Sequence, residues 1–150
     1  KIPPLAPFSL ASKYEITNES EILSFYIDYY QYTGGAHGGI TRIAYNINTK
    51  TGKEMELKEL FKEDYDYKAI INSEVNKQIN KNPEYYFTGE LGFNGIKDNQ
   101  YFYINSNELV IYYQLYEIAP YAFGLPEFRI SPNTFEDNYL YDKIDIINKA

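Results

Sequence analysis

The chain contains no cysteine, no tryptophan, one methionine and one histidine in its 150 residues. Without cysteine it can form neither disulfide bonds nor thiolate metal sites, although the compartment in which it works stays open. A zinc site built on the single His37 would need carboxylates as all its other ligands, so we expect no metal and no other cofactor. No apolar run reaches the roughly 20 residues that cross a bilayer, and no signal peptide opens the sequence. Because the first residue is Lys1, we expect a longer precursor that carries any export signal or membrane anchor.

Positive charge is scarce as well. Lys and Arg together number 14 against 21 Asp and Glu, which gives a formal net charge of −7. Phosphate backbones and anionic lipid surfaces repel a chain of this sign, so nucleic acid is not an expected partner. A cationic protein would be attracted, although acidity also serves solubility in proteins that have no such partner.

Aromatic side chains are abundant, with 18 tyrosines and nine phenylalanines. Tyrosine suits half-buried strands and contact surfaces, because its ring packs while its hydroxyl stays in water. We interpret the excess as a solvated, tyrosine-lined sheet face in preference to a dedicated ligand platform.

Residues 29–45, YYQYTGGAHGGITRIAY, place a glycine cluster between two stretches that alternate like strands. Glycine reaches backbone conformations that strain other residues, so the cluster predicts a tight turn between two strands. It lacks the lysine of a P-loop and is followed by a strand, which argues against phosphate binding at a helix N-terminus. We expect the histidine ring to hydrogen-bond to the backbone and fix this turn, in preference to a catalytic role. The structural motif comprises Gly34, Gly35, His37, Gly38 and Gly39.

Hydrophobic periodicity predicts an α+β fold, with an antiparallel sheet of about five strands and one main helix, residues 66–81, packed on one face. The helix is indicated by an apolar stripe at helical spacing, namely Tyr67, Ile70, Ile71, Val75 and Ile79. The predicted strands cover residues 13–17, 22–33, 40–48, 100–104, 109–116 and 127–130.

In the strand over residues 22–33, side chains alternate between two sides. One side carries Leu23, Phe25, Ile27 and Tyr29, and the other carries Ser24, Tyr26, Asp28 and Tyr30. We expect the second side to be the part-solvated one.

A single domain is expected over residues 13–131. Three prolines make residues 1–12 an extended lead-in. Residues 132–150 form an acidic, tyrosine-rich tail, in which a short helix through Ile144 and Ile147 is conceivable.

Two acidic residues, Glu117 and Glu127, flank the proline- and glycine-containing loop at 119–126. Paired carboxylates can hydrolyse glycosides, but such pairs are easy to find among 21 acidic residues. We favour solvated carboxylates, or ion pairs with Arg42 or Arg129, over catalysis.

The strings TGGAHG and EIAPYAFGLPEF, within residues 12–130, resemble a domain of bacterial envelope proteins from Firmicutes. That domain forms the extracellular C-terminal part of the anti-sigma-V factor RsiV and also occurs in the peptidoglycan deacetylase PdaC, outside its catalytic domain. The resemblance to RsiV implies a receptor for lysozyme. In RsiV, the binding of lysozyme exposes the anti-sigma factor to proteolysis. It also implies an extracellular or cell-surface location, membrane-anchored or as a lipoprotein, with membrane contact only through an anchor outside these residues.

The resemblance makes a non-catalytic extracellular binding domain the leading hypothesis, such as a lysozyme-sensing ectodomain that binds a cationic protein. One alternative is a glycan-binding accessory domain that recognises peptidoglycan; another is a carboxylate-dependent hydrolase acting on wall fragments. The candidate surface comprises the loops at 34–39, 84–95 and 119–126, since aromatic anchors on shaped loops are typical of binding hot spots. The candidate binding residues are Tyr85, Tyr86, Tyr121 and Phe123, with Pro120 and Gly124 shaping the last loop. Each aromatic could equally be a core anchor for its loop.

Overall fold

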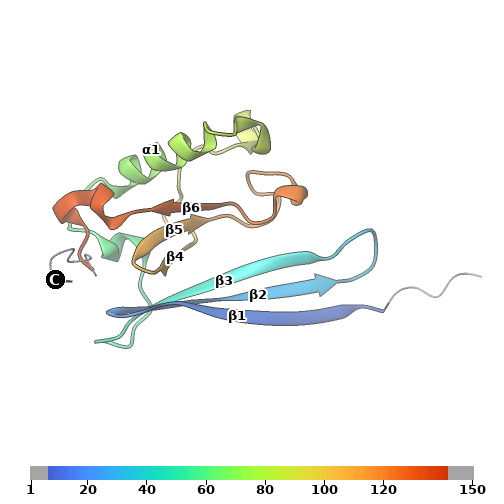
Figure 1. The fold of residues 1–150 in the computed structure, drawn as a ribbon, viewed down its shortest axis with the longest axis horizontal. Coiled ribbons are helices and arrows are strands. Elements are labelled where there is room, and N and C mark those ends of the chain that lie inside the picture. Colours follow the sequence, from blue (N-terminus) through green and yellow to red (C-terminus); the bar gives the residue numbers. More distant parts are fainter. Residues whose placement is uncertain (1–6, 142–150) are drawn as a thin grey trace, which may run out of the picture.

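The computed structural model describes residues 7–141 and has an α+β fold in three layers (Figure 1). Helix α1 (Tyr67–Ile79) covers one face of a three-stranded antiparallel sheet, and a second three-stranded antiparallel sheet packs on the other face. The first sheet contains β4 (Phe102–Asn105), β5 (Glu108–Tyr112) and β6 (Glu127–Ile130); the second contains β1 (Ser9–Glu19), β2 (Ile22–Tyr32) and β3 (Gly39–Asn48).

The α+β class, the antiparallel strands and the main helix are as predicted, but the single sheet of about five strands was wrong. Alternation shows that a segment is a strand and which residues share a side, but it does not show which strands pair. Here each strand pairs with its neighbours in the chain, and the helix-containing segment between β3 and β4 separates the two sheets.

Helix α1 begins at the capping residue and ends before the proline that the sequence indicated. The carboxylate of Asp66 accepts a hydrogen bond from the backbone N–H of Ala69 at 3.1 Å, as an N-cap does. The helix ends at Ile79, shortly before Pro83. Ile71 and Val75 are fully buried against the sheet, so the predicted stripe faces the core.

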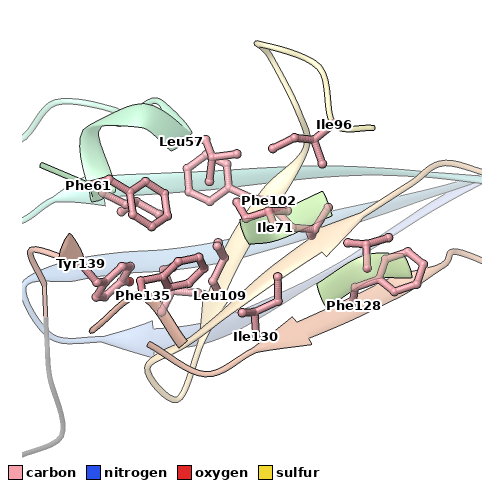
Figure 2. Close-up of a cluster of buried hydrophobic side chains, with 14 of the residues drawn as sticks. Leu57, Phe61, Ile71, Ile96, Phe102, Leu109, Phe128, Ile130, Phe135 and Tyr139 are labelled. Atoms are coloured by element: carbon pink, nitrogen blue, oxygen red, sulfur yellow. The ribbon is translucent and has the colours of Figure 1, made fainter. Parts of the chain in front are cut away.

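The main core lies between α1 and the sheet β4–β5–β6 (Figure 2). It also includes the segment after β6, which forms a 3-10 helix at Pro132–Asn138. Phe135 and Tyr139 from this segment, which was expected to open the tail, are buried beside Phe61. The possible helix through Ile144 and Ile147 lies outside the described residues.

The sheet β1–β2–β3 packs on its neighbour through its polar side. Ser24 is fully buried, donates to Asn46 Oδ1 at 2.6 Å, and accepts from the backbone N–H of Ile104 in β4 at 3.2 Å. The opposite side, with Leu23 and Phe25, forms the outer layer (Figure 1). The expectation that the polar side is the solvated one was therefore wrong, because alternation does not reveal which side another layer covers.

Arg42 in β3 joins the two sheets. Its guanidinium donates to both carboxylate oxygens of Asp28 at 2.7 Å and also pairs with Glu127 in β6. The guanidinium carbon lies 3.6 Å from the ring centroid of Tyr26, a cation–π arrangement. Burial opposes the positive charge, but the hydrogen bonds and charge of Asp28 outweigh it, so the pKa of Arg42 is raised.

Tyr113, just after β5, offers a test of the core. Its ring lies edge-on between Phe93 and Phe128, and its hydroxyl is the one buried side-chain polar atom among residues 7–141 that lacks a hydrogen-bond partner. Burial, and then the charge of Glu117, raise the pKa of this hydroxyl, so it stays protonated at neutral pH.

Since an unsatisfied buried hydroxyl costs free energy, Tyr113→Phe should raise the free energy of unfolding by about 1 kcal/mol in urea denaturation. The matched control is Tyr112→Phe, because the Tyr112 hydroxyl accepts from the backbone N–H of Ala44 at 3.1 Å. That change should lower stability by about 1 kcal/mol. A loss of stability in Tyr113→Phe as well would contradict the assignment.

Candidate functional site

Three loops distant in sequence meet at one end of the molecule (Figure 1). The ring of Tyr121, from the loop between β5 and β6, stacks on His37 of the glycine turn, with centroids 3.7 Å apart. Phe123 contacts Tyr85 and Tyr86, which follow α1, at 5.8 and 5.1 Å between ring centroids. The fold thus brings together all four candidate binding residues and the glycine turn.

The glycine turn is held in a defined conformation. Gly34 and Gly35 have φ angles of 101° and 95°, a region that side chains rarely adopt. A Cβ at Gly38 would lie 2.5 Å from the ring of Tyr30, so this position requires a close approach. The Tyr121 hydroxyl donates to the carbonyl of Gly38 at 2.8 Å and ties the turn to the opposite loop.

The aromatic residues of these loops differ in exposure. Tyr85 is 50% exposed and Phe123 39% exposed, so both rings are accessible from solvent. Tyr86 is half-buried and reaches the core ring of Phe128, at 5.9 Å between centroids, and therefore anchors its loop. Tyr121 is also half-buried, between His37 and the neighbouring loop.

Tyr116 was not singled out from the sequence, where it ends the predicted strand over residues 109–116. The structure ends β5 at Tyr112 and places Tyr116 in the following loop at a φ of 64°. Its side chain is 56% exposed and lies 5.8 Å from Tyr121 between ring centroids. The sequence did not indicate that Tyr116 leaves the strand, because this residue continues the mostly apolar run that begins at residue 109. We define the loop surface as Tyr85, Tyr116, Tyr121, Phe123 and His37.

A hollow of about 390 Å³ adjoins the loop surface. It lies between the start of β3 and residues 114–116, and Tyr116 stands at its edge. Its lining is uncharged and mixes polar side chains, such as Gln31, Thr33 and Gln114, with the apolar Ile40 and Leu115. Such a hollow can receive an uncharged polar group of a partner.

The polar residues near the loop surface are engaged in structural contacts. The Nδ1 atom of His37 lies 3.1 Å from the carbonyl oxygen of Gly38. Glu117 accepts from Lys97 Nζ at 3.0 Å and from the backbone N–H of Gln114 at 3.0 Å. Glu127 pairs with Arg42, one of the two arginines that the sequence suggested. These contacts hold the loops and strands in place.

A larger groove of about 620 Å³ lies beside β3 and the residues before β4. Tyr101, 45% exposed, stacks there on Tyr112, and three acidic residues line the walls. Two of the three are already paired, Glu56 with Lys58 and Asp98 with Lys68. The groove therefore attracts a cation less than its acidic lining suggests.

Residues 7–141 contain neither a candidate metal site nor a candidate membrane span. No group of three or more His, Asp or Glu side chains in this part of the chain is placed to hold a metal ion. No helix within the same residues is both long and apolar enough to cross a membrane.

Two family models match the chain. The model described as "Protein of unknown function (DUF3298)" matches residues 58–132, which is half of the 150 residues. The model described as "Deacetylase PdaC" matches residues 1–39. No curated protein matches the chain. These matches confirm the resemblance to a domain that is shared with PdaC-type proteins.

Two solved structures have a similar fold. A member of the DUF3298 family from Bacteroides fragilis aligns with a TM-score of 0.73 and 23% identity, over 93% of this chain and 57% of its own. A DUF3298 family protein from Pseudomonas aeruginosa aligns with a TM-score of 0.64 and 16% identity, over 89% of this chain and 62% of its own. At these identities the likeness concerns the fold alone, and the chain spans less than two thirds of either protein.

Proposed function

This chain belongs to the DUF3298 family of proteins of unknown function, and we propose that it is a non-catalytic extracellular domain that binds a cationic protein such as lysozyme. The proposed contact is the loop surface. The family model named "Deacetylase PdaC" matches residues 1–39, and the resemblance to PdaC motivates the proposal of a cell-wall setting, where a lysozyme would be met.

The convergence of aromatic loops is the observation that carries this proposal. Tyr85, Tyr116 and Phe123 each expose more than a third of their surface, on loops fixed by stacking and by the Tyr121–Gly38 hydrogen bond. Large aromatic side chains dominate binding energy at interfaces, and loops that are already ordered lose little entropy on binding. The arrangement therefore suits a protein partner.

Net charge favours a cationic partner. The chain carries a charge of −7, and such a protein raises the association rate of a positively charged partner. Electrostatic attraction of this kind weakens as salt is added, whereas aromatic contacts persist. The two contributions can therefore be separated by varying ionic strength.

The test is calorimetric titration of the domain with lysozyme at about 0.15 M salt, where long-range charge effects are damped. Tyr85→Ala and Phe123→Ala should each weaken binding by about tenfold or more, because they remove exposed aromatic anchors. The matched control is Tyr14→Ala, an exposed tyrosine in β1 outside the loop surface. Its affinity should equal that of the unaltered chain. No heat at this salt concentration, or equal weakening by the control, refutes the proposal.

Peptidoglycan is the second candidate, and the PdaC match over residues 1–39 is the observation that favours it. Exposed tyrosines beside an uncharged hollow of mixed polarity suit a sugar chain, which offers hydroxyl groups and apolar ring faces. Sedimentation with purified wall sacculi tests it. Retention in the pellet that is lost in Tyr116→Ala supports a glycan partner, and absence from the pellet removes it.

A further inference from the structure

A separate hollow of about 240 Å³ lies between residues 90–97, in the loop after α1, and residues 113–118, which follow β5. We call it the Tyr113 hollow, and its lining includes Glu90, Phe93, Lys97, Tyr113, Glu117 and Ile118. None of these residues belongs to the loop surface. Pockets for drug-sized ligands have volumes of about 300–1,000 Å³, so this one suits a smaller molecule.

The hydroxyl of Tyr113 distinguishes this hollow from the others. Tyr113 is 3% exposed, and its hydroxyl has no hydrogen-bond partner within residues 7–141. Burial, and then the charge of the lining residue Glu117, raise the pKa of this hydroxyl, so it keeps its proton and lies near that carboxylate. Buried polar groups without a partner are rare in folded proteins, and each one demands an explanation.

The rest of the lining restricts what the hollow can receive. Phe93 lies edge-on to Tyr113, at 6.2 Å between ring centroids, so this part of the lining is apolar. Lys97 and Glu117 pair at 3.0 Å, which leaves the Glu90 carboxylate as excess negative charge. An anion is therefore repelled, and a purely apolar molecule leaves the hydroxyl unsatisfied. A neutral ligand with an acceptor oxygen and a small apolar group avoids both costs.

One wall of the hollow belongs to the loop 88–95, whose hydrogen bonds run within the loop itself. The backbone N–H of Gly92 donates to the carbonyl of Gly89 at 3.1 Å. The side-chain amide of Asn94 donates to the carbonyls of Gly89 and Gly92 at 3.1 and 3.0 Å. A ligand reaches the buried hydroxyl only if a wall yields, and a loop bonded to itself can move outward as a unit at little cost.

We infer that the Tyr113 hollow binds a neutral secondary amide of the acetamido type. The carbonyl oxygen of the amide accepts the hydrogen bond that the Tyr113 hydroxyl offers, and its methyl group packs on Phe93 and Ile118. The carboxylates of Glu90 and Glu117 are available to its N–H. Acetamido groups occur on amino sugars and on acetylated peptides, and the two sources share this chemistry. The site is separate from the loop surface and does not depend on the function proposed above.

The inference explains why the chain carries a hydroxyl that costs stability. Tyr113→Phe is expected to stabilise the free chain, so folding alone does not account for the tyrosine. Binding sites retain polar groups that lower stability, because those groups are satisfied only when the ligand is bound. The same substitution should therefore raise stability and weaken binding.

NMR titration of the ¹⁵N-labelled 150-residue chain tests the inference, with N-acetylglucosamine in one arm and N-acetylalanine N-methylamide in the other. Glucose is the control ligand, because it has the sugar ring without the amide. We expect shifts at the backbone amides of Gly92, Gly95 and Ile118, with a dissociation constant on the order of 1–10 mM for so small a ligand. A response in one arm alone identifies the sugar or the peptide as the source.

Tyr113→Phe should weaken amide binding by about tenfold, because the ligand carbonyl would be buried without a donor. The matched control is Tyr112→Phe, since the Tyr112 hydroxyl bonds to the backbone of Ala44 outside the hollow. Its affinity should equal that of the unaltered chain.

Three results would overturn the inference. They are no shifts with either amide, an equal response to glucose, and unchanged binding in Tyr113→Phe. If the first is accompanied by a loss of stability in Tyr113→Phe, the partner of the hydroxyl is a buried water. Lysozyme binding tests a different surface, because Tyr113→Phe leaves every residue of the loop surface in place.

Discussion

Phe135→Ala is expected to lower the free energy of unfolding by about 3–5 kcal/mol, because it removes a large ring from a fully buried site. The ring lies 4.8 Å from that of Phe61 between centroids, in an edge-on arrangement. The backbone around it is fastened to the segment before α1. The backbone N–H of Lys62 donates to the carbonyl of Asn138 at 2.9 Å, and the backbone N–H of Leu140 donates to the carbonyl of Leu60 at 2.9 Å.

The comparison for this change is Leu140→Ala, in the same segment but half exposed. It should cost no more than about 0.5 kcal/mol. Urea denaturation followed by circular dichroism measures both. If the two substitutions cost the same small amount, residues 132–140 do not belong to the folded domain.

Arg42→Ala has the second-largest expected effect, a loss of about 2–4 kcal/mol of unfolding free energy. The change leaves the carboxylates of Asp28 and Glu127 without their shared cation and removes the packing on Tyr26. The arginine side chain is 9% exposed, whereas its two carboxylate partners are 24% and 30% exposed. Because water reaches the carboxylates, we place the cost below that of a fully buried pair.

Arg129→Ala is the control, since Arg129 in β6 pairs with Glu108 at 3.5 Å and its side chain is 49% exposed. An exposed pair of this kind contributes about 0–1 kcal/mol. Chemical denaturation of both variants under identical conditions gives the comparison. Equal small losses would mean that Arg42 does not hold the two sheets together.

Paired polar side chains explain why the polar side of β1–β3 can face inward. The space between the sheets holds a small apolar cluster of Tyr103, Val110 and Tyr112, surrounded by hydrogen-bonded polar side chains. Gln114 donates to the carbonyl of Arg42 at 2.7 Å and accepts from its N–H at 3.0 Å, so a side chain closes part of the free edge of β3. Buried polar groups are tolerated when they are paired in this way.

The loop surface was partly foreseeable. Glycine and proline marked the turns, and aromatic residues within them suggested Tyr85, Tyr86, Tyr121 and Phe123. The stacking of Tyr121 on His37 was not foreseeable, because 84 positions separate the two residues in the chain. Tyr116 gave no signal, since its departure from β5 depends on a positive φ that the local sequence does not require.

The sequence by itself determined the local elements. Helical spacing and the Asp66 cap define α1, alternation defines β2 and β3, and the apolar run after Asn107 defines the central strand β5. Each of these features depends on neighbours within a few residues, where periodicity and capping act directly. The family resemblance also came from the sequence alone, through the short and uncommon strings TGGAHG and EIAPYAFGLPEF.

Only the tertiary structure decided how these elements meet. It divided the strands into two sheets, buried Phe135 in a segment expected to be a tail, and paired Arg42 with Glu127 across 85 positions. It also turned the apolar side of β1–β3 outward. A two-residue period states which side chains share a side, whereas the choice of the covered side depends on contacts with distant residues that no local pattern encodes.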